Sequence, residues 1–216
     1  MGAALADGAD LEGPQAGRVS ASPAPPLLLA STSPQRRAIL EQLGLPFEVV
    51  APAFDEDDDA DVPPVELVRE HARGKARSVA GQAAPGQPVL GVDTTVVLDG
   101  AVFGKPADAA GAEWMLERLG GRTHEVVSGL CLLTPGWEEV VDATTRVTFR
   151  ALTPRDLAWY VALGEWEGRA GGYAIQGQGA ALVERIEGDY LNVVGLPAAA
   201  LVRLLAERFS GTYGYG

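Results

Sequence analysis

The sequence predicts a mixed α/β domain whose strands are not all parallel. Strand-like and helix-like segments alternate from residue 27 onward, which is typical of an α/β fold. Asp99-Gly100, a two-residue turn signal, directly follows a run of strand formers and predicts a hairpin. The chain has 216 residues, of which 47% are hydrophobic, so it can bury a sizeable core. We find no internal repeat and no linker after residue 27.

The first predicted elements are two short strands on either side of a helix. The apolar run at residues 27–30 predicts a buried strand, and residues 47–50 predict a second one. Between them, residues 34–43 predict a helix that starts at a proline and ends at Gly44. Residues 64–80 predict a longer helix, because apolar side chains recur there at three- and four-residue spacing: Val65, Val68, Ala72, Ala76 and Val79.

The later elements follow from the same signals. Residues 89–98 are rich in β-branched side chains and predict a strand, and residues 101–103 predict its hairpin return. Two further strands and three further helices are expected, at residues 109–119 (helix), 126–133 and 140–149 (strands), 154–163 and 197–209 (helices). We therefore expect one domain over residues 27–209, a flexible tail over residues 1–26 and a loose tail over residues 210–216.

Charge and composition exclude several classes of protein. The formal net charge is -12, which argues against a general nucleic-acid binder, because such proteins need a basic face to neutralise phosphates. An anion bound by this chain must be held by a local positive site. The single cysteine, Cys131, excludes an internal disulfide. No apolar stretch approaches the roughly 20 residues that span a bilayer, and residues 1–26 lack the pattern of a secretory signal, so we expect a cytoplasmic protein.

The stretch "LLLASTSPQRRAIL", residues 27 to 40, is the first candidate site. Pro34 suits the first helical position, which makes Ser33 the N-cap. A helix N-terminus leaves backbone N–H groups unpaired and attracts anions. Ser31 and Thr32 add hydroxyl groups, and Arg36 can offer a bidentate fork to a phosphate. The alternative is an ordinary capped helix with solvated arginines.

A second candidate is Asp93 in "GVDTTVVLDG", residues 91 to 100. Ionised carboxylates are rarely buried in a strand unless they are paired or bind a metal. Strand alternation places Asp93 on one face and Thr94 on the other. Asp93 is therefore a candidate general base or magnesium ligand. The alternative is a strand-end aspartate whose carboxylate accepts from backbone donors.

Two loops complete the set of candidates. In "FGKPAD", residues 103 to 108, Lys105 follows Asp93 by the length of a hairpin, so both can face one cleft. In "GGYAIQGQGA", residues 171 to 180, the glycines exclude a regular element, and the spacing matches neither a dinucleotide fingerprint nor a P-loop. Gln176 is the side chain of that loop that can both donate to and accept from a base edge. Tyr173 and Tyr190 either stack on a base or pack in the interior.

Together these motifs resemble the Maf family of nucleoside triphosphate pyrophosphatases. The resemblance runs from Leu27 to about Leu205 and also includes "FDE", "GKA", "GGRTHEVVSGL" and "VERIEGDYLNVVGLP". It implies a fold like that of the inosine triphosphatases: a strongly bent mixed sheet, flanked by helices, with a central cleft between two lobes. It further implies hydrolysis of a nucleoside triphosphate to the monophosphate and pyrophosphate, a divalent cation (Mg²⁺ or Mn²⁺), and a homodimer.

The resemblance also assigns roles to residues of this sequence. It implies that Asp93 is the proton acceptor that activates water, and that Glu56 and Asp93 hold the metal. Lys75 and Lys105 would contact phosphates in the reaction. The substrate-binding residues would be of two kinds: Ser31, Ser33 and Arg36 for the triphosphate, and Gln35, Thr94 and Gln176 for the base.

The resemblance leaves the substrate open between two types, one acting on dTTP and UTP and one acting on 7-methyl-GTP. Thr94 and Gln176 favour the pyrimidine type, and we expect dTTP and UTP to be the better substrates. Gln35 favours the other type, because many members have arginine there. Two functions of other classes are also considered: a non-catalytic nucleotide-sensing regulator of cell division, and a nucleic-acid binder that uses the same cleft.

Overall fold

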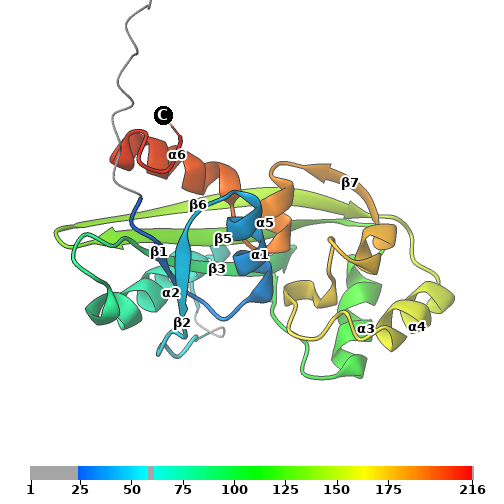
Figure 1. Cartoon of the computed structure of the whole chain (residues 1–216). Coiled ribbons are helices and arrows are strands. Elements are labelled where there is room, and N and C mark those ends of the chain that lie inside the picture. Colours follow the sequence, from blue (N-terminus) through cyan, green and yellow to red (C-terminus); the bar gives the residue numbers. More distant parts are fainter. Residues whose placement is uncertain (1–23, 58–60, 216) are drawn as a thin grey trace, which may run out of the picture.

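The computed structural model describes residues 24–57 and 61–215 and contains one seven-stranded mixed sheet (Figure 1). The strand order is β2-β1-β3-β5-β6-β7, and β4 pairs with β3. The strands are β1 (Leu27–Ala30), β2 (Phe47–Val50), β3 (Val89–Leu98), β4 (Ala101–Phe103), β5 (Thr123–Thr134), β6 (Trp137–Phe149) and β7 (Val183–Glu187).

Helices flank the sheet, as predicted. They are α1 (Pro34–Gln42), α2 (Pro64–Val79), α3 (Ala109–Leu119), α4 (Pro154–Ala162), α5 (Tyr190–Val194) and α6 (Ala198–Phe209). Three short 3₁₀ helices are also present in the described residues: η1 (Ala80–Gln82), η2 (Ala170–Gly172) and η3 (Gln178–Leu182). Every strand and helix predicted from the sequence is present, with ends that differ by a few residues. The prediction missed β7 and α5, both only five residues long.

The mixed character of the sheet is confirmed by its register. Strand β1 runs parallel to both β2 and β3, whereas β3, β5, β6 and β7 pair antiparallel, and β4 returns on β3 as the predicted hairpin. The pairing of β1 with β3 ends at Ala30 and Gly91, and that of β4 begins at Val96. Within the part of the chain that the structure describes, residues 92–95 of β3 therefore pair with β5 alone. This gap in the sheet opens beside Asp93.

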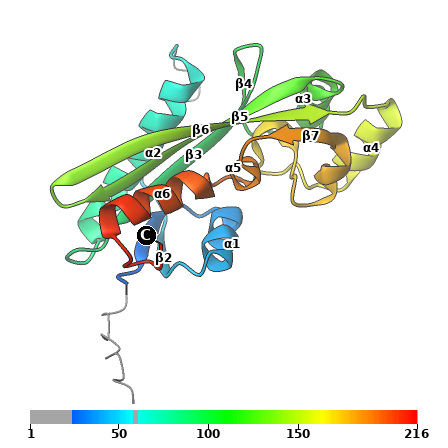
Figure 2. The ribbon, with the colours of Figure 1, turned by 90° about the horizontal axis from the view of Figure 1, so that it is seen from above.

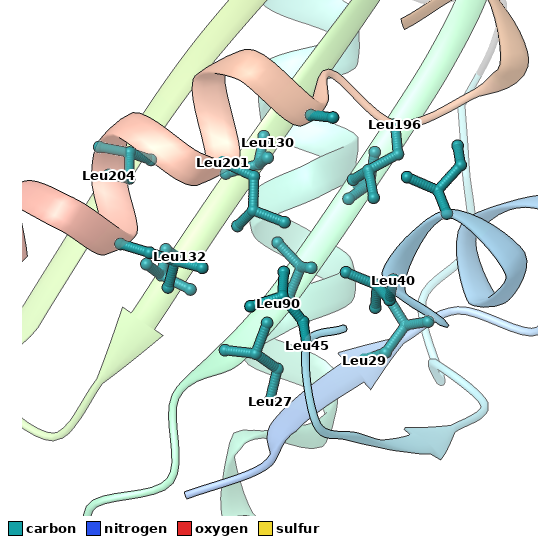
Figure 3. Packing of buried hydrophobic residues seen from close by; sticks show 14 of the residues in the cluster. Leu27, Leu29, Leu40, Leu45, Leu90, Leu130, Leu132, Leu196, Leu201 and Leu204 are labelled. Carbon is teal, nitrogen blue, oxygen red and sulfur yellow. The ribbon is translucent and has the colours of Figure 1, made fainter. Parts of the chain in front are cut away.

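Alternation along β3 divides the core between the two faces of the sheet. Leu90 and Val92 belong to a cluster with leucines of β1, α1, β5 and α6. Figure 3 shows Leu90 among those leucines. Val89 points the other way and packs with Ala72 and Ala76 of α2. Helices α2 and α6 accordingly lie on opposite faces of the sheet (Figure 2).

A second cluster of buried side chains lies at the other end of the long strands. It joins the ends of β3, β5 and β6 to α3 and α4 and includes Val96, Leu116, Phe149 and Tyr160. The loop that follows α4 and contains η2 packs on this cluster through Tyr173 and Ile175. The two clusters thus fix the α1 side and the α3–α4 side of the molecule around the same central strand.

Two glycines allow α2 to approach the sheet very closely. A Cβ atom built on Gly91 would lie 2.1 Å from the backbone oxygen of Ala72, and one built on Gly129 would lie 2.2 Å from that of Val68. Real Cβ atoms do not approach backbone that closely, so any side chain here would push α2 away. Because Gly129 pairs with Asp93 across the strands, this contact also sets the distance between α2 and Asp93.

The carboxyl-terminal segment differs from the expectation of a loose tail. Tyr213 is buried against the α1–α6 cluster, and its hydroxyl donates to the Pro25 carbonyl at 2.8 Å. The hydroxyl of Tyr215 donates to the Leu43 carbonyl at 3.0 Å. Two aromatic side chains in the glycine-rich stretch therefore anchor it. The expected tail at residues 1–26 lies outside the described residues except for residues 24–26.

We expect Gly129→Ala to lower the free energy of unfolding by about 1–3 kcal/mol or more, the cost of overpacking a core. The new methyl group has to displace the backbone of α2 at Val68. Urea denaturation of the purified variant measures the change. Gly81→Ala is the matched control, because no heavy atom lies within 4 Å of a Cβ there. Equal stability of the two variants would contradict the close contact.

Candidate active site

A cleft of about 460 Å³ opens at the gap in the sheet between β1 and β4. It is bordered on one side by the start of α1 and on the other by the loops that follow β4 and α4. All of the site residues predicted from the sequence line it: Ser31, Ser33, Gln35, Arg36, Glu56, Lys75, Asp93, Thr94, Lys105 and Gln176. Segments far apart in the sequence thus contribute to one cavity.

Asp93 lies at the centre of this cleft and is only 7% exposed. Lys75 of α2 donates from Nζ to Asp93 Oδ1 at 2.6 Å and lies 3.0 Å from Glu56 Oε1. His71, one turn earlier on α2, places Nδ1 3.4 Å from Asp93 Oδ2. Side chains of α2, rather than backbone donors, therefore compensate the buried charge.

These neighbours determine the protonation state of Asp93. Burial by itself would raise its pKa, but the hydrogen bond with His71 and the charge and hydrogen bond of Lys75 outweigh burial. The pKa of Asp93 therefore lies well below its ordinary value, and the carboxylate is ionised at neutral pH. The same hydrogen bond raises the pKa of His71 above its ordinary value, against the effect of burial.

The start of α1 has the predicted capping geometry. Ser33 is the N-cap, Pro34 follows at the first helical position, and Ser33 Oγ accepts from the Arg36 N–H. The Arg36 guanidinium turns into the protein and donates at 3.0 Å from Nε to the Gly195 carbonyl and at 3.0 Å from Nη1 to Ser31 Oγ. Burial lowers the pKa of Arg36, and the charges of Asp93 and Glu56 partly offset that effect. Because these bonds use Nε and Nη1, only some N–H groups of the Arg36 guanidinium can still bind a phosphate.

Thr94 lies on the opposite face of β3 from Asp93, as alternation predicts. Its hydroxyl lies 2.8 Å from Ser128 Oγ on β5 and 3.5 Å from Arg36 Nη2. Both residues line the cleft, because β1 has ended at this level of β3 and leaves this edge of the strand open. Gln35 lies nearby, with Oε1 accepting from Ser33 Oγ at 3.0 Å.

The loop that contains Gln176 is held by two side chains that the sequence analysis did not single out. The Tyr160 hydroxyl accepts from the Ala174 N–H at 2.9 Å. The Glu165 carboxylate accepts from the backbone N–H groups of Gln178 at 3.0 Å and of Gly179 at 3.2 Å. Glu165 and Tyr160 precede the loop by a dozen or so residues and belong to no motif, so the sequence offered no signal for them.

The two tyrosines left open by the sequence have different environments. Tyr173 is buried, and its hydroxyl lies 2.9 Å from His124 Nε2, so it packs in the interior while also lining the cleft. Tyr190 is 44% exposed and lines a smaller hollow of about 270 Å³ beside the cleft. Gln35 and Gln176 line both cavities. The hollow is therefore next to the residues expected to meet a base.

The residues around Asp93 fit a divalent cation. Glu56, His71 and Asp93 each offer one ligand atom, and these atoms lie within 4.8 Å of one another. Carboxylate oxygen suits Mg²⁺ and Mn²⁺, and imidazole nitrogen suits Mn²⁺ better than Mg²⁺. His71 was absent from the predicted ligand set because a lone histidine in a helix gives no metal-binding spacing.

Comparison with known proteins gives the family. A family model described as Maf-like protein matches residues 26–208. The chain belongs to the Maf family. The dTTP/UTP pyrophosphatase of Symbiobacterium thermophilum is 49% identical over 181 residues, which cover 84% of this chain and 93% of that protein. The dTTP/UTP pyrophosphatase of Deinococcus radiodurans is 44% identical over 196 residues, 91% of this chain and 98% of that protein.

A further relative in the Maf family and one solved structure complete the comparison. The dTTP/UTP pyrophosphatase of Gloeobacter violaceus is 50% identical over 181 residues, 84% of this chain and 95% of that protein. The match to the structure of the Staphylococcus aureus Ham1 protein covers 57% of this chain and 71% of that chain, at 17% identity and a TM-score of 0.41. Among the described residues, no helix is both long and apolar enough to cross a bilayer.

We expect Lys75→Met to lower the free energy of unfolding by about 1–3 kcal/mol, because it leaves Asp93 without its nearest cation. The double variant Lys75→Met with Asp93→Asn removes the uncompensated charge and should recover much of that loss. Urea denaturation of both single variants and the double variant gives the coupling free energy. Simple additivity of the two effects would mean that the Lys75–Asp93 pair is not energetically coupled.

Proposed function

We propose that this chain hydrolyses dTTP and UTP to the nucleoside monophosphate and pyrophosphate. The observation that supports this most directly is the cleft itself, in which an ionised, buried Asp93 lies close to the cations Lys75 and Arg36, and Lys105 lines the same cavity. The family relatives at 44–50% identity are named dTTP/UTP pyrophosphatase and match over nearly their whole length. A non-catalytic nucleotide sensor would need the cations but would have no use for Asp93.

The first requirement of the mechanism is to neutralise the negative charge of the triphosphate. A nucleoside triphosphate brings about four negative charges, so an acidic protein must bind it through local cations. Lys75 is shared between Asp93 and Glu56 in this structure. When Lys75 instead donates to a phosphate oxygen, Asp93 loses its 2.6 Å hydrogen bond with the Lys75 ammonium and becomes a better base. Asp93 then accepts a proton from the water that attacks the α-phosphorus, and pyrophosphate leaves.

Glu56 and Asp93 would hold the divalent cation, Mg²⁺ or Mn²⁺, with His71 beside them. When bound, the cation supplies positive charge that neutralises the phosphates and stabilises the departing pyrophosphate. The protein's own part is to hold the two carboxylates within reach of one another. It does so because Lys75 lies between them and because α2 is packed directly on the sheet.

The base is recognised by Thr94 and Gln176, which line the same cleft as Asp93. A glutamine amide can donate to the carbonyl and accept from the N–H of a uracil or thymine ring. The backbone bonds to Glu165 and Tyr160 limit how far the Gln176 loop can move. Gln35 is held by Ser33 and carries no charge, so it does not favour a cationic base such as 7-methylguanine by electrostatics.

The remaining expectations also belong to this proposal. We place the protein in the cytoplasm as a homodimer that binds neither nucleic acid nor membrane. The net charge of -12 supports the exclusion of nucleic acid, because a polyanion would be repelled outside the cleft. Size-exclusion chromatography with light scattering tests the dimer, and a gel shift on duplex DNA tests the exclusion.

A screen of nucleoside triphosphates with Mg²⁺ tests the reaction and the substrate together. We expect monophosphate and pyrophosphate in equal amounts, and a higher kcat/KM for dTTP and UTP than for CTP, GTP and 7-methyl-GTP. Products are separated by ion-exchange chromatography. Orthophosphate and a nucleoside diphosphate without pyrophosphate would overturn the reaction. A tenfold preference for 7-methyl-GTP would overturn the pyrimidine assignment alone.

Asp93→Asn should lower turnover by roughly 10²–10⁴-fold, the usual contribution of a general base. Nucleotide binding should persist, because the change removes a negative charge from an anion site. Steady-state kinetics and isothermal calorimetry measure the two effects separately. Asp142→Asn is the matched control, since Asp142 lies on β6 in an exposed ion pair with Arg69 outside the cleft. Near-normal turnover of Asp93→Asn would mean that Asp93 is structural.

A further inference from the structure

Arg169 is a cation of the cleft that no motif of the sequence indicated. It lies in the loop between α4 and η2 and lines the cavity together with Glu167 and Gly168. Its Nε atom is fully buried and has no hydrogen-bond partner among the described residues. Within residues 24–57 and 61–215, its guanidinium makes no ion pair. Buried polar atoms of native proteins are almost always paired, so Arg169 is an arginine whose donors the described residues do not use.

Lys105 lies on the neighbouring loop and lines the same cleft. Its ammonium is exposed to the cleft and makes no ion pair with any described residue. A backbone hydrogen bond of 3.0 Å from the Gly171 N–H to the Gly104 carbonyl joins the two loops. Lys105 and Arg169 are one and two residues from that bond. Lys105 and Arg169 thus lie on two hydrogen-bonded loops that line one cavity. An anion bound there would reduce the repulsion between the two positive charges.

The loop of Arg169 is rigidly built. Gly171 has a φ of 69°, which other residues rarely adopt, and a Cβ there would lie 2.8 Å from Val96 Cγ2 on β3. The close contact presses the loop against the central strand. Before Arg169 in the chain, the Glu165 carboxylate accepts hydrogen bonds from the backbone N–H groups of Gln178 and Gly179. Arg169 is therefore presented from a fixed position.

The other two cations of the cleft are already engaged inside the protein. Lys75 is bonded to Asp93 and close to Glu56, and Arg36 donates to Gly195, Ser31 and Thr94. The acidic groups that line the cleft are Glu56 and Asp93 beside Lys75, and Glu167 beside Arg169. Glu167 forms no ion pair with Arg169 in this structure. The donors free to meet a ligand are concentrated on Lys105 and Arg169.

We propose that Arg169 acts with Lys105 to bind the two terminal phosphoryl groups of the substrate, which leave as pyrophosphate. These groups carry about three of the four charges of a triphosphate, so they need the donors that the protein has not used. The α-phosphoryl group then lies toward Asp93. Arg169 is a binding residue in this assignment, and the planar fork of arginine can contact two phosphate oxygens at once. The assignment rests on the proposed pyrophosphatase activity.

The test compares the affinity of the two products for Arg169→Ala at fixed Mg²⁺, by calorimetry with pyrophosphate and with dTMP. We expect about tenfold or greater weakening of pyrophosphate binding, with dTMP binding unchanged. Lys105→Ala should show the same pattern, and Arg169→Lys should recover part of the loss. Arg155→Ala is the matched control, because this substitution removes the same charge from an exposed position on α4 outside the cleft.

The outcomes separate the two proposals. Unchanged pyrophosphate binding by Arg169→Ala, or equal losses for pyrophosphate and dTMP, overturns the assignment of Arg169 even if the enzyme cleaves dTTP normally. Failure of the wild-type protein to release pyrophosphate from any nucleotide overturns the proposed function instead. A lower melting temperature of Arg169→Ala without ligand would mark Arg169 as a structural residue and also overturn the assignment.

Discussion

The burial of one negative charge in the middle of the central strand is the constraint on which the site depends. Asp93 is 7% exposed, and such a carboxylate is costly unless cations and hydrogen bonds surround it. Lys75 and His71 belong to α2. They reach Asp93 because Gly91 and Gly129 let the backbone of α2 lie directly on β3 and β5. The early end of β1 then leaves the same strand open to a ligand.

The cations of the cleft consequently fall into two kinds. Those on α1 and α2 are engaged with protein groups and hold the carboxylates and the start of α1 in place. Those on the loops after β4 and α4 have no partner within the described ranges. This division explains how a chain with a net charge of -12 can attract a polyanion: the framework is neutralised internally, and the remaining positive charge faces the cavity.

How much the sequence predicted depends on the length and regularity of each element. Helix α2 was predicted well because its apolar residues keep a clear helical period, and strand β3 because its ten residues are rich in β-branched side chains. Strand β7 was missed, since three of its five residues are charged and its pairing partner β6 is distant in sequence. Helix α5 was missed because five residues are too few for a period, although Asp189 caps it.

For the site, the sequence alone determined the residues with unusual local chemistry: a carboxylate among strand formers, a serine and proline that begin a helix, and a glutamine in a glycine loop. Family resemblance added Glu56 and Lys75. Only the tertiary structure decided that His71 meets Asp93, that Glu165 fixes the Gln176 loop, and that the Arg169 loop is bonded to the Lys105 loop. The same holds for Arg169 Nε, which has no hydrogen-bond partner among the described residues. The physical reason is that a local pattern records backbone geometry and burial, whereas hydrogen bonds and charge compensation form between segments that meet only when the sheet and its helices have packed.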